Sequence, residues 1–261
     1  MNLNLSGKVA LVCGGSKGIG YASAVELAKL GARIILVSRT EASLQSRVKE
    51  LSQINDQEHE YIAVDMSDRS ALGEGVKKHL DKGPIHIVLN NTGGPPAGSI
   101  VRATPDQFLA AMQGHLLVNH SLAQLLIPGM REAGYGRIIN MVSTSVRQPI
   151  DGLGVSNTTR GAVASWAKTL STELAPDGIT VNNVLPGATK TERLEQIIDA
   201  RTESSGRKKD VIVETFLDEI PMYRFAEPEE IGSMVAFLAS PAAAYITGVS
   251  IPVDGGRIRC I

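Results

Sequence analysis

The chain has few cysteines, no long hydrophobic run and almost no excess of charge. Its two cysteines, Cys13 and Cys260, lie at opposite ends without metal-ligand spacing, so they predict neither a disulfide framework nor a metal site and fit a reducing cytoplasm. The longest apolar runs are strand-length, well short of the ~20 residues of a membrane-crossing helix. A formal net charge of -1 gives no field that would attract nucleic acid or an anionic membrane. We therefore expect a soluble, cytoplasmic protein without a bound metal.

The sequence does contain short apolar runs that alternate with longer stretches of helical spacing. Seven such runs recur, from "KVALVCG" near the N-terminus to "VSIPVDGG" near the C-terminus. Uniformly apolar strands are typical of a parallel sheet that is covered on both faces. No linker or internal repeat divides the chain, so we predict a single-domain α/β Rossmann fold over residues 1–261, with a seven-stranded parallel sheet and helices on both faces.

One segment departs from this alternation. Residues 190–224 are polar and charged, and they are interrupted at Ser204, Ser205 and Gly206. Ligands of open α/β sheets bind beyond the carboxyl ends of the strands. A long excursion after the sixth strand therefore predicts a helical substrate flap.

A glycine loop follows the first predicted strand. Gly14, Gly18 and Gly20 in "CGGSKGIG" stand between that strand and a helix, where glycines allow a backbone to approach a pyrophosphate. Such clusters also form ordinary strand-to-helix turns. After the second strand come Ser38 and Arg39, where NAD-preferring proteins commonly carry a carboxylate. Arg39 and Lys17 could grip a 2′-phosphate, which favours NADP(H), or they could be solvated surface cations.

Further polar residues follow later strands. Asp65 could accept a hydrogen bond from an adenine amino group, or it could cap the helix that begins near Asp68. The segment "LNNTGG" ends the fourth strand, where Gly93 leaves room for a cofactor or simply forms a turn. The residues that we predict to bind NADP(H) are Gly14, Ser16, Lys17, Gly18, Ile19, Gly20, Ser38, Arg39, Asp65, Met66, Asn91, Gly93, Arg160, Pro186, Gly187, Thr189 and Thr191.

Together these motifs resemble the short-chain dehydrogenase/reductase family across nearly the whole chain. "GGSKGIG" resembles its glycine loop, "NNTGG" its Asn-Asn-Ala-Gly segment, "GRIINMVS" the strand that carries its serine and "NVLPGATKTER" its Pro-Gly motif. The C-terminal region is similar to that of bacterial 3-oxoacyl-[acyl-carrier-protein] reductases. The resemblance implies hydride transfer between a nicotinamide and a carbonyl or alcohol carbon. It also implies a small-molecule substrate, acyl-carrier-linked ones included, and a homotetramer.

The catalytic residues of the family have largely changed here. The family serine corresponds to Ser143, but its tyrosine falls on Ser156, its lysine on Arg160 and its asparagine on His115. No tyrosine occurs between Tyr135 and Tyr223, so a shift of the alignment does not recover one. The resemblance makes Ser143, Ser156, Arg160 and His115 the candidate catalytic residues.

The replacements alter what the side chains can do. A serine hydroxyl is a far weaker acid than a phenol, and an arginine does not release a proton at working pH. A positioned general acid contributes about 10²–10⁴ in rate, so its loss does not exclude hydride transfer. Imidazole is a common proton donor with a pKa near 6.5, which makes His115 the candidate replacement. In the alternative, His115 is a helix residue bonded to a backbone carbonyl, and Ser156 is a helix N-cap.

Two other side-chain groups also have structural readings. Ser143 could be only a hydroxyl at the end of a strand, and Thr189 and Thr191 could bind the nicotinamide carboxamide or start the flap. The first functional hypothesis is an NADP(H)-dependent reductase with a divergent proton-donor site. The second is a nucleotide-binding protein without turnover that acts as a sensor or interaction partner. A structural subunit that binds no cofactor is the third.

Overall fold

The computed structural model describes residues 1–260, and its centre is one parallel sheet of seven strands in the order β3-β2-β1-β4-β5-β6-β7. The prediction of a seven-stranded sheet is confirmed. The strands are β1 (Val9–Cys13), β2 (Arg33–Ser38), β3 (Glu60–Ala63), β4 (Ile87–Asn90), β5 (Gly136–Met141), β6 (Ile179–Pro186) and β7 (Ser250–Val253).

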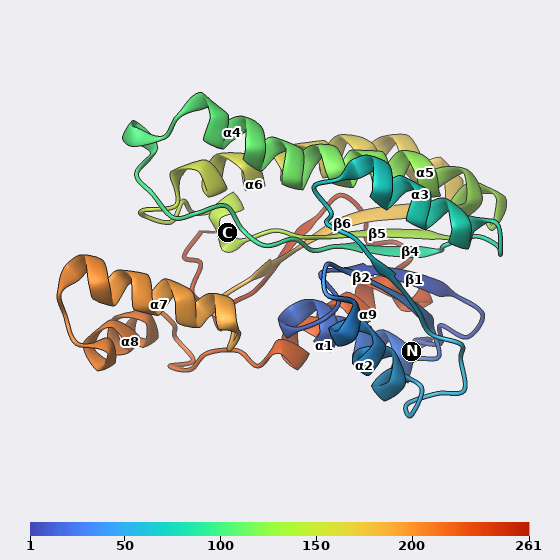
Figure 1. Cartoon of the computed structure of the whole chain (residues 1–261), viewed down its shortest axis with the longest axis horizontal. Coiled ribbons are helices and arrows are strands. Elements are labelled where there is room, and N and C mark those ends of the chain that lie inside the picture. The colour runs from blue at the N-terminus through green and yellow to red at the C-terminus, as the bar shows by residue number, and fades with distance from the viewer. Residues whose placement is uncertain (261) are drawn as a thin grey trace.

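Helices cover both faces of the sheet (Figure 1). One layer contains α1 (Gly18–Lys29), α2 (Glu41–Leu51) and α9 (Pro228–Ala239). The other contains α3 (Arg69–Leu80), α4 (Pro105–Met112), α5 (Val118–Glu132) and α6 (Gly154–Leu174). This three-layer arrangement explains why the strands carry apolar residues on both faces, because alternate side chains enter opposite cores.

The two cores can be followed along β1 and β2. Val12 and Leu36 pack into the core under α1 and α9, whereas Leu11 and Ile35 pack into the core under α5 and α6. All four side chains are fully buried. Because all seven strands run parallel, their carboxyl ends lie along the same edge of the sheet.

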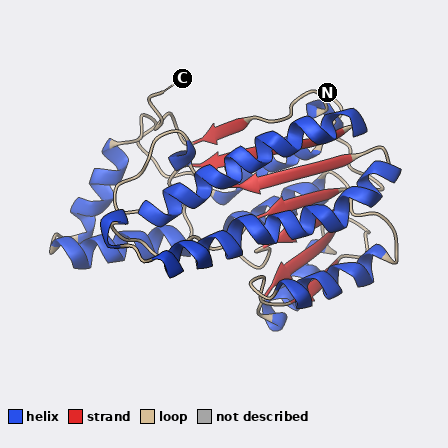
Figure 2. Cartoon of the chain, turned by 90° about the horizontal axis from the view of Figure 1, so that it is seen from above, coloured by secondary structure: helices blue, strands red, loops and turns tan. Residues whose placement is uncertain are grey.

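Residues 190–224 contain two helices, α7 (Glu192–Ser205) and α8 (Lys209–Asp218). They lie beyond the carboxyl ends of the strands, at the left of Figures 1 and 2. Gly206 ends α7 in the left-handed conformation with φ +67°, as the predicted interruption requires. A small apolar cluster of their own holds the pair together, formed by Leu194, Ile198, Ile212 and Phe216. Whether this pair closes over a substrate stays a prediction.

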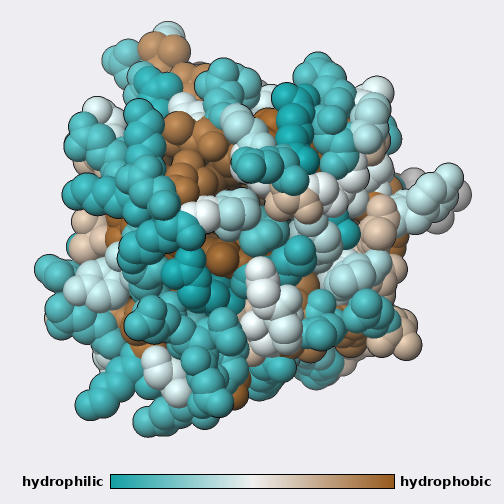
Figure 3. Space-filling view, turned by 90° about the vertical axis from the view of Figure 1, so that its right-hand side faces the viewer, coloured by the Kyte–Doolittle hydropathy of each residue, from teal (hydrophilic) through white to brown (hydrophobic). Residues whose placement is uncertain are grey.

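The side of the molecule opposite α7 and α8 is mostly polar at its surface. Figure 3 shows this face as mainly hydrophilic, with hydrophobic side chains visible only in recesses and small patches. Among the described residues, no helix has both the length and the apolar composition that crossing a bilayer would need.

A ladder of buried asparagines joins four neighbouring strands, from the carboxyl ends of β4 and β5 through the middle of β6 to the first residue of β7. Asn90 Nδ2 donates to Asn140 Oδ1 at 2.8 Å, Asn140 Nδ2 donates to Asn183 Oδ1 at 3.0 Å, and Asn183 Nδ2 donates to Ser250 Oγ at 3.0 Å. The same residues are paired in the backbone register of β4, β5, β6 and β7. The ladder therefore fixes the register at the edge where the candidate site lies.

The ladder predicts a large stability cost for Asn140→Ala. Asn140 is fully buried, and its loss would leave the Asn90 amide without a side-chain partner and the Asn183 Oδ1 without a donor, while Asn183 would keep its bond to Ser250. We expect the free energy of unfolding to fall by roughly 2–4 kcal/mol in urea denaturation. The control is Gln53→Ala, an exposed residue that should change it by less than about 0.5 kcal/mol. An equal effect of both substitutions would contradict the role assigned to the ladder.

Candidate active site

The glycine loop between β1 and α1 is too tightly packed for larger residues. Gly14 and Gly18 adopt positive φ angles of +61° and +56°. A Cβ at Gly20 would lie 2.2 Å from the carbonyl oxygen of Gly14, so the helix could not approach the loop so closely. Lys17 is the N-cap of α1, and no side chain caps the first turn. The backbone N–H groups at this end of α1 are thus left for an anionic ligand.

Asn91 ties the end of β4 to this loop. Its Nδ2 donates to the carbonyl oxygen of Cys13 at 3.2 Å, and its side chain lies where a Cβ on Gly14 or Gly20 would clash. Burial raises the pKa of the Cys13 thiol to about 12, which keeps this neighbour protonated. The predicted binding residues Gly14, Gly20 and Asn91 therefore form one packed unit.

The predicted 2′-phosphate residues lie in different environments. The Ser38 hydroxyl is buried and has no hydrogen-bond partner among residues 1–260. Arg39 is exposed and close enough to Asp65 to lower the pKa of its carboxyl, after the larger effect of two hydrogen bonds from Ser67. Lys17 forms an ion pair with Glu192 at the start of α7. Lys17 would have to leave that carboxylate to reach a phosphate.

Asp65 does not cap a helix. It accepts hydrogen bonds from Ser67 N at 2.9 Å and from Ser67 Oγ at 2.7 Å, whereas Asp68 caps α3 by accepting from Ala71 N at 3.0 Å. The capping interpretation of Asp65 is therefore wrong, and Asp68 takes that role.

Ser143 follows β5 and precedes a short 3-10 turn. Its Oγ accepts a hydrogen bond from the backbone N–H of Ser145 at 3.1 Å, so the hydroxyl proton is free to be donated elsewhere. Ser143 is half-buried. Both the catalytic and the strand-end readings of this residue are compatible with the contact.

Ser156 lies inside α6 and not at its cap. The helix begins at Gly154, and Leu153 is the N-cap, so the N-cap interpretation of Ser156 is wrong. Asn157 anchors the preceding loop instead, because its Nδ2 donates to the carbonyl oxygen of Ile150 at 2.9 Å. Ser156 is half-buried, and within the described residues its hydroxyl makes no hydrogen bond.

Arg160 is a buried guanidinium one turn further along α6. Arg160 is only 8% exposed, and its Nη1 donates to the carbonyl oxygen of Met141 at 2.9 Å. Burial, and then the positive charge of Arg193, lowers the pKa of Arg160 to about 10. Arg160 therefore stays protonated at neutral pH, as expected for an arginine.

His115 lies in a π-helical turn, Gln113–Leu117, between α4 and α5. Such turns are frequent at functional sites. His115 Nδ1 lies 2.5 Å from Thr92 Oγ1, so its partner is this hydroxyl and not a backbone carbonyl. Burial, and then the nearby charge of Arg160, lowers the pKa of His115 to about 3. This pKa lies well below the ordinary value of about 6.5, so the imidazole is neutral at neutral pH.

The segment after β6 passes close to the glycine loop. A Cβ at Gly187 would lie 2.7 Å from Asp254 Cα, so only glycine fits directly after Pro186. Thr189 is buried and donates to the carbonyl oxygen of Gly187 at 3.1 Å. Thr191 is the N-cap of α7, as the flap-start reading predicted, and its methyl group lies 3.3 Å from where Gly18 would carry a Cβ.

The remaining predicted cofactor residues have mainly structural contacts. The carbonyl oxygen of Ser16 accepts from Arg47 Nε at 3.2 Å. Ile19 and Met66 pack against the two cores. Gly93 is exposed, with no other atom within 4 Å of its Cβ position. Open space at Gly93 is compatible with a bound ligand.

Two residues of this region were not predicted. Thr92 pairs with His115, and Arg193 donates from Nη2 to the carbonyl oxygen of Pro95 at 3.1 Å. The threonine stands where the resemblance placed an alanine, beside an asparagine that had become histidine. That pair of replacements was a readable signal, whereas nothing in "TERLE" distinguished Arg193 from a surface cation.

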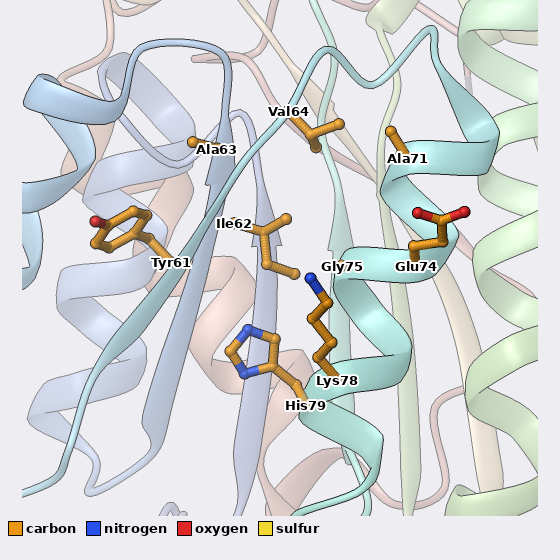
Figure 4. A pocket seen from close by; sticks show the side chains of 9 residues that line it. All are labelled: Tyr61, Ile62, Ala63, Val64, Ala71, Glu74, Gly75, Lys78 and His79. Carbon is orange, nitrogen blue, oxygen red and sulfur yellow. The ribbon is translucent and has the colours of Figure 1, made fainter.

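A separate pocket of about 310 Å³ lies between β3 and α3, away from these residues. Figure 4 shows Lys78 and His79 on α3 beside Ile62 of β3. None of the predicted site residues lines it. In residues 1–260, no group of three or more histidine, cysteine or acidic side chains is placed to bind a metal.

The neutral state of His115 predicts acid sensitivity. The unfolded chain would take up this proton below about pH 6.5, whereas the folded chain does so only near pH 3, so stability is lost as the pH falls between these values. At pH 4.5 the loss from this residue is roughly 2–3 kcal/mol. His115→Asn should reduce the acid slope of the free energy of unfolding. The control is His120→Asn, an exposed histidine, which should keep the wild-type slope.

Comparison with known proteins places this site in a family. A family model described as Enoyl-(Acyl carrier protein) reductase matches residues 14–257. The 3-oxoacyl-[acyl-carrier-protein] reductase FabG of Pseudomonas aeruginosa is 33% identical, over 97% of this chain and 98% of its own.

Two solved structures are also similar. The structure of L-sorbose reductase from Gluconobacter frateurii, complexed with NADPH and L-sorbose, superposes with a TM-score of 0.93 at 32% identity, covering 100% of both chains. YwfH, an NADPH-dependent reductase involved in bacilysin biosynthesis, gives 0.92 at 28% identity, covering 98% of this chain and 100% of its own. The chain belongs to the short-chain dehydrogenase/reductase family of oxidoreductases.

Proposed function

We propose that this protein is an NADP(H)-dependent oxidoreductase that reduces a carbonyl to an alcohol, or performs the reverse reaction, with an altered proton-donor site. The observation that carries the proposal is the packed unit of Gly14, Gly20 and Asn91 beside an uncapped helix N-terminus. This geometry supports binding of a pyrophosphate, because the backbone can approach the anion and the helix N–H groups are free of side-chain caps. Residues 1–261 would form the NADP(H)-binding domain, with residues 190–224 as its substrate flap.

The choice of NADP(H) over NAD(H) rests on the end of β2. The buried Ser38 hydroxyl lacks a partner, and the neighbouring Arg39 is exposed with a planar guanidinium suited to phosphate. No carboxylate stands at either position to hold a ribose 2′-hydroxyl or to repel a 2′-phosphate. The NADPH in the L-sorbose reductase structure supports the same choice.

The chain's own residues would divide the work as follows. When bound, the nicotinamide supplies or accepts a hydride. Ser143 would donate its free hydroxyl proton as a hydrogen bond to the substrate oxygen, and Arg160 would supply the positive charge on the ribose side. Since His115 is neutral, its role would be to hold Thr92. Proton delivery would then fall to hydroxyl groups that exchange with solvent, for which half-buried Ser143 and Ser156 are the candidates.

This arrangement predicts slow chemistry with an intact binding site. Loss of a positioned general acid costs about 10²–10⁴ in rate. Small carbonyl or alcohol compounds are the proposed substrates, and FabG extends the class to acyl-carrier-linked ones. A cytoplasmic homotetramer is the proposed form of the protein.

The cofactor proposal is tested by Ser38→Asp. A carboxylate at this position would repel a 2′-phosphate and accept from a ribose hydroxyl, so NADPH should bind roughly 10- to 100-fold more weakly and NADH more tightly. Fluorescence titration of both nucleotides measures the change. Ser43→Asp on exposed α2 adds the same charge and should leave the preference unchanged. A wild-type preference for NADH would contradict the proposal.

The proton-donor proposal is tested by the double variant Ser156→Tyr with Arg160→Lys. Restoring a phenol and a lysine should raise the turnover of neutral ketones by roughly 10²-fold or more, measured as NADPH oxidation over a carbonyl panel. Ser156→Phe with Arg160→Lys is the matched control, because it fills the same space without a hydroxyl. Equal rates for the two double variants would show that the acid is not what the site lacks.

One observation favours a second candidate, a nucleotide-binding protein without turnover. Ser156 stands in place of the family's acidic tyrosine, whereas Arg160 keeps the positive charge of the family's lysine. Tight NADPH binding by the wild type without turnover on any carbonyl compound or alcohol would support this second function over the first.

A further inference from the structure

We propose that Arg160 and Arg193 form a binding site for an anionic group of the substrate, so that the substrate is a carbonyl or alcohol compound that carries a carboxylate. This inference rests on the proposed function for its reaction and on the structure for its site. Arg160 comes from α6 in the body of the protein, and Arg193 comes from α7 in the flap.

The two guanidinium groups converge on one point beside Gly94. The position that a Cβ on Gly94 would occupy lies 3.5 Å from Arg193 Nη2 and 3.9 Å from Arg160 Nη2. Backbone carbonyls orient both side chains: Met141 O holds Arg160, and Pro95 O holds Arg193. Because Gly94 has no side chain, the space between the guanidinium groups remains available to a small planar anion.

The charges at this point are not balanced by the protein. Within residues 1–260, neither Arg160 nor Arg193 has a carboxylate oxygen within 4.0 Å. Several exposed cations of the chain, such as Lys17, Arg131 and Arg224, do pair with a carboxylate. The neighbouring Glu192 is engaged by Lys17 on the other side. The causes that lower the pKa of Arg160 are burial and Arg193, and no acid opposes them. Arg160 is buried and Arg193 is exposed at the mouth of the same space, so an anion that reaches it from solvent would offset both charges.

Position favours substrate over cofactor as the source of this anion. The predicted pyrophosphate site is the glycine loop, where Thr191 covers Gly18. Arg193 extends instead to Pro95, beyond the end of β4, and Arg160 bonds to Met141, two residues before Ser143. Two guanidinium forks match the planar geometry of a carboxylate better than that of a neutral alcohol.

The binding test uses calorimetry with benzoate as the probe and benzamide as its uncharged equivalent, on the protein with and without NADPH. We expect benzoate to bind and benzamide not to bind. Arg193→Gln should weaken benzoate binding roughly 10- to 100-fold, as expected for loss of a charged hydrogen-bond donor. Gly94→Ala should do the same by filling the space between the guanidinium groups, and its contacts of 3.5–3.9 Å allow the chain to fold.

Two control variants make the same chemical changes as Arg193→Gln and Gly94→Ala at other positions. Arg207→Gln removes an exposed flap cation, and Gly161→Ala adds a methyl group to α6 where no other atom lies within 4 Å. Both should bind benzoate like the wild type. Equal binding of benzoate and benzamide, or equal losses in the control variants, would overturn the anion site.

Cofactor titration separates this proposal from the proposed function. Arg193→Gln and Gly94→Ala should bind NADPH as the wild type does; if they lose NADPH as strongly as benzoate, the anion is a cofactor phosphate and the substrate proposal is overturned. In the activity arm, 2-oxo acids should exceed their amides about tenfold or more in kcat/KM, and Arg193→Gln should remove that preference. Turnover of amides and acids alike would sustain the oxidoreductase and overturn the carboxylate site.

Discussion

The hydrogen-bonded asparagine ladder across β4, β5, β6 and β7 is the constraint on which the site depends. A parallel sheet places the ends of its strands along one edge, but a site needs those ends in an exact register. Asn90, Asn140 and Asn183 provide this because each is buried and donates its amide hydrogen to the residue directly opposite on the next strand. Asn91 and Thr92 follow Asn90 directly, Met141 ends β5 directly after Asn140, and Ser143 lies two residues further along.

From that edge, two buried groups set the electrostatics. Met141 presents its carbonyl to Arg160, and Thr92 presents its hydroxyl to His115. The charge of the arginine and the exclusion of water both keep the imidazole neutral. Under the proposed function, a site that the family builds around a phenol and an ammonium would here be built around hydroxyl groups and a guanidinium, and such groups bind anions more readily than they release protons.

Much of this architecture could be predicted from the sequence, because apolar strands and glycine turns have local causes. The seven strands and the helical segment interrupted at Gly206 follow from patterns within a few residues. The pairing of Thr92 with His115 and the approach of Arg193 to Gly94 could not be predicted, since they join residues from separate elements. The capping alternative for Asp65 failed for a local reason: two carboxylates precede the same helix, and Asp68 is the one that accepts from Ala71.

The hydrophobic cluster within α7 and α8 has a consequence for how the protein can change over evolutionary time. Because Leu194, Ile198, Ile212 and Phe216 pack chiefly on one another, the two helices carry their own small interior. Beyond the first turn of α7, which contacts the glycine loop and Pro95, substitutions or changes of length in this pair need not disturb the sheet. If the pair acts as the proposed substrate flap, selection could change which compounds are accepted while the rest of the fold stays the same.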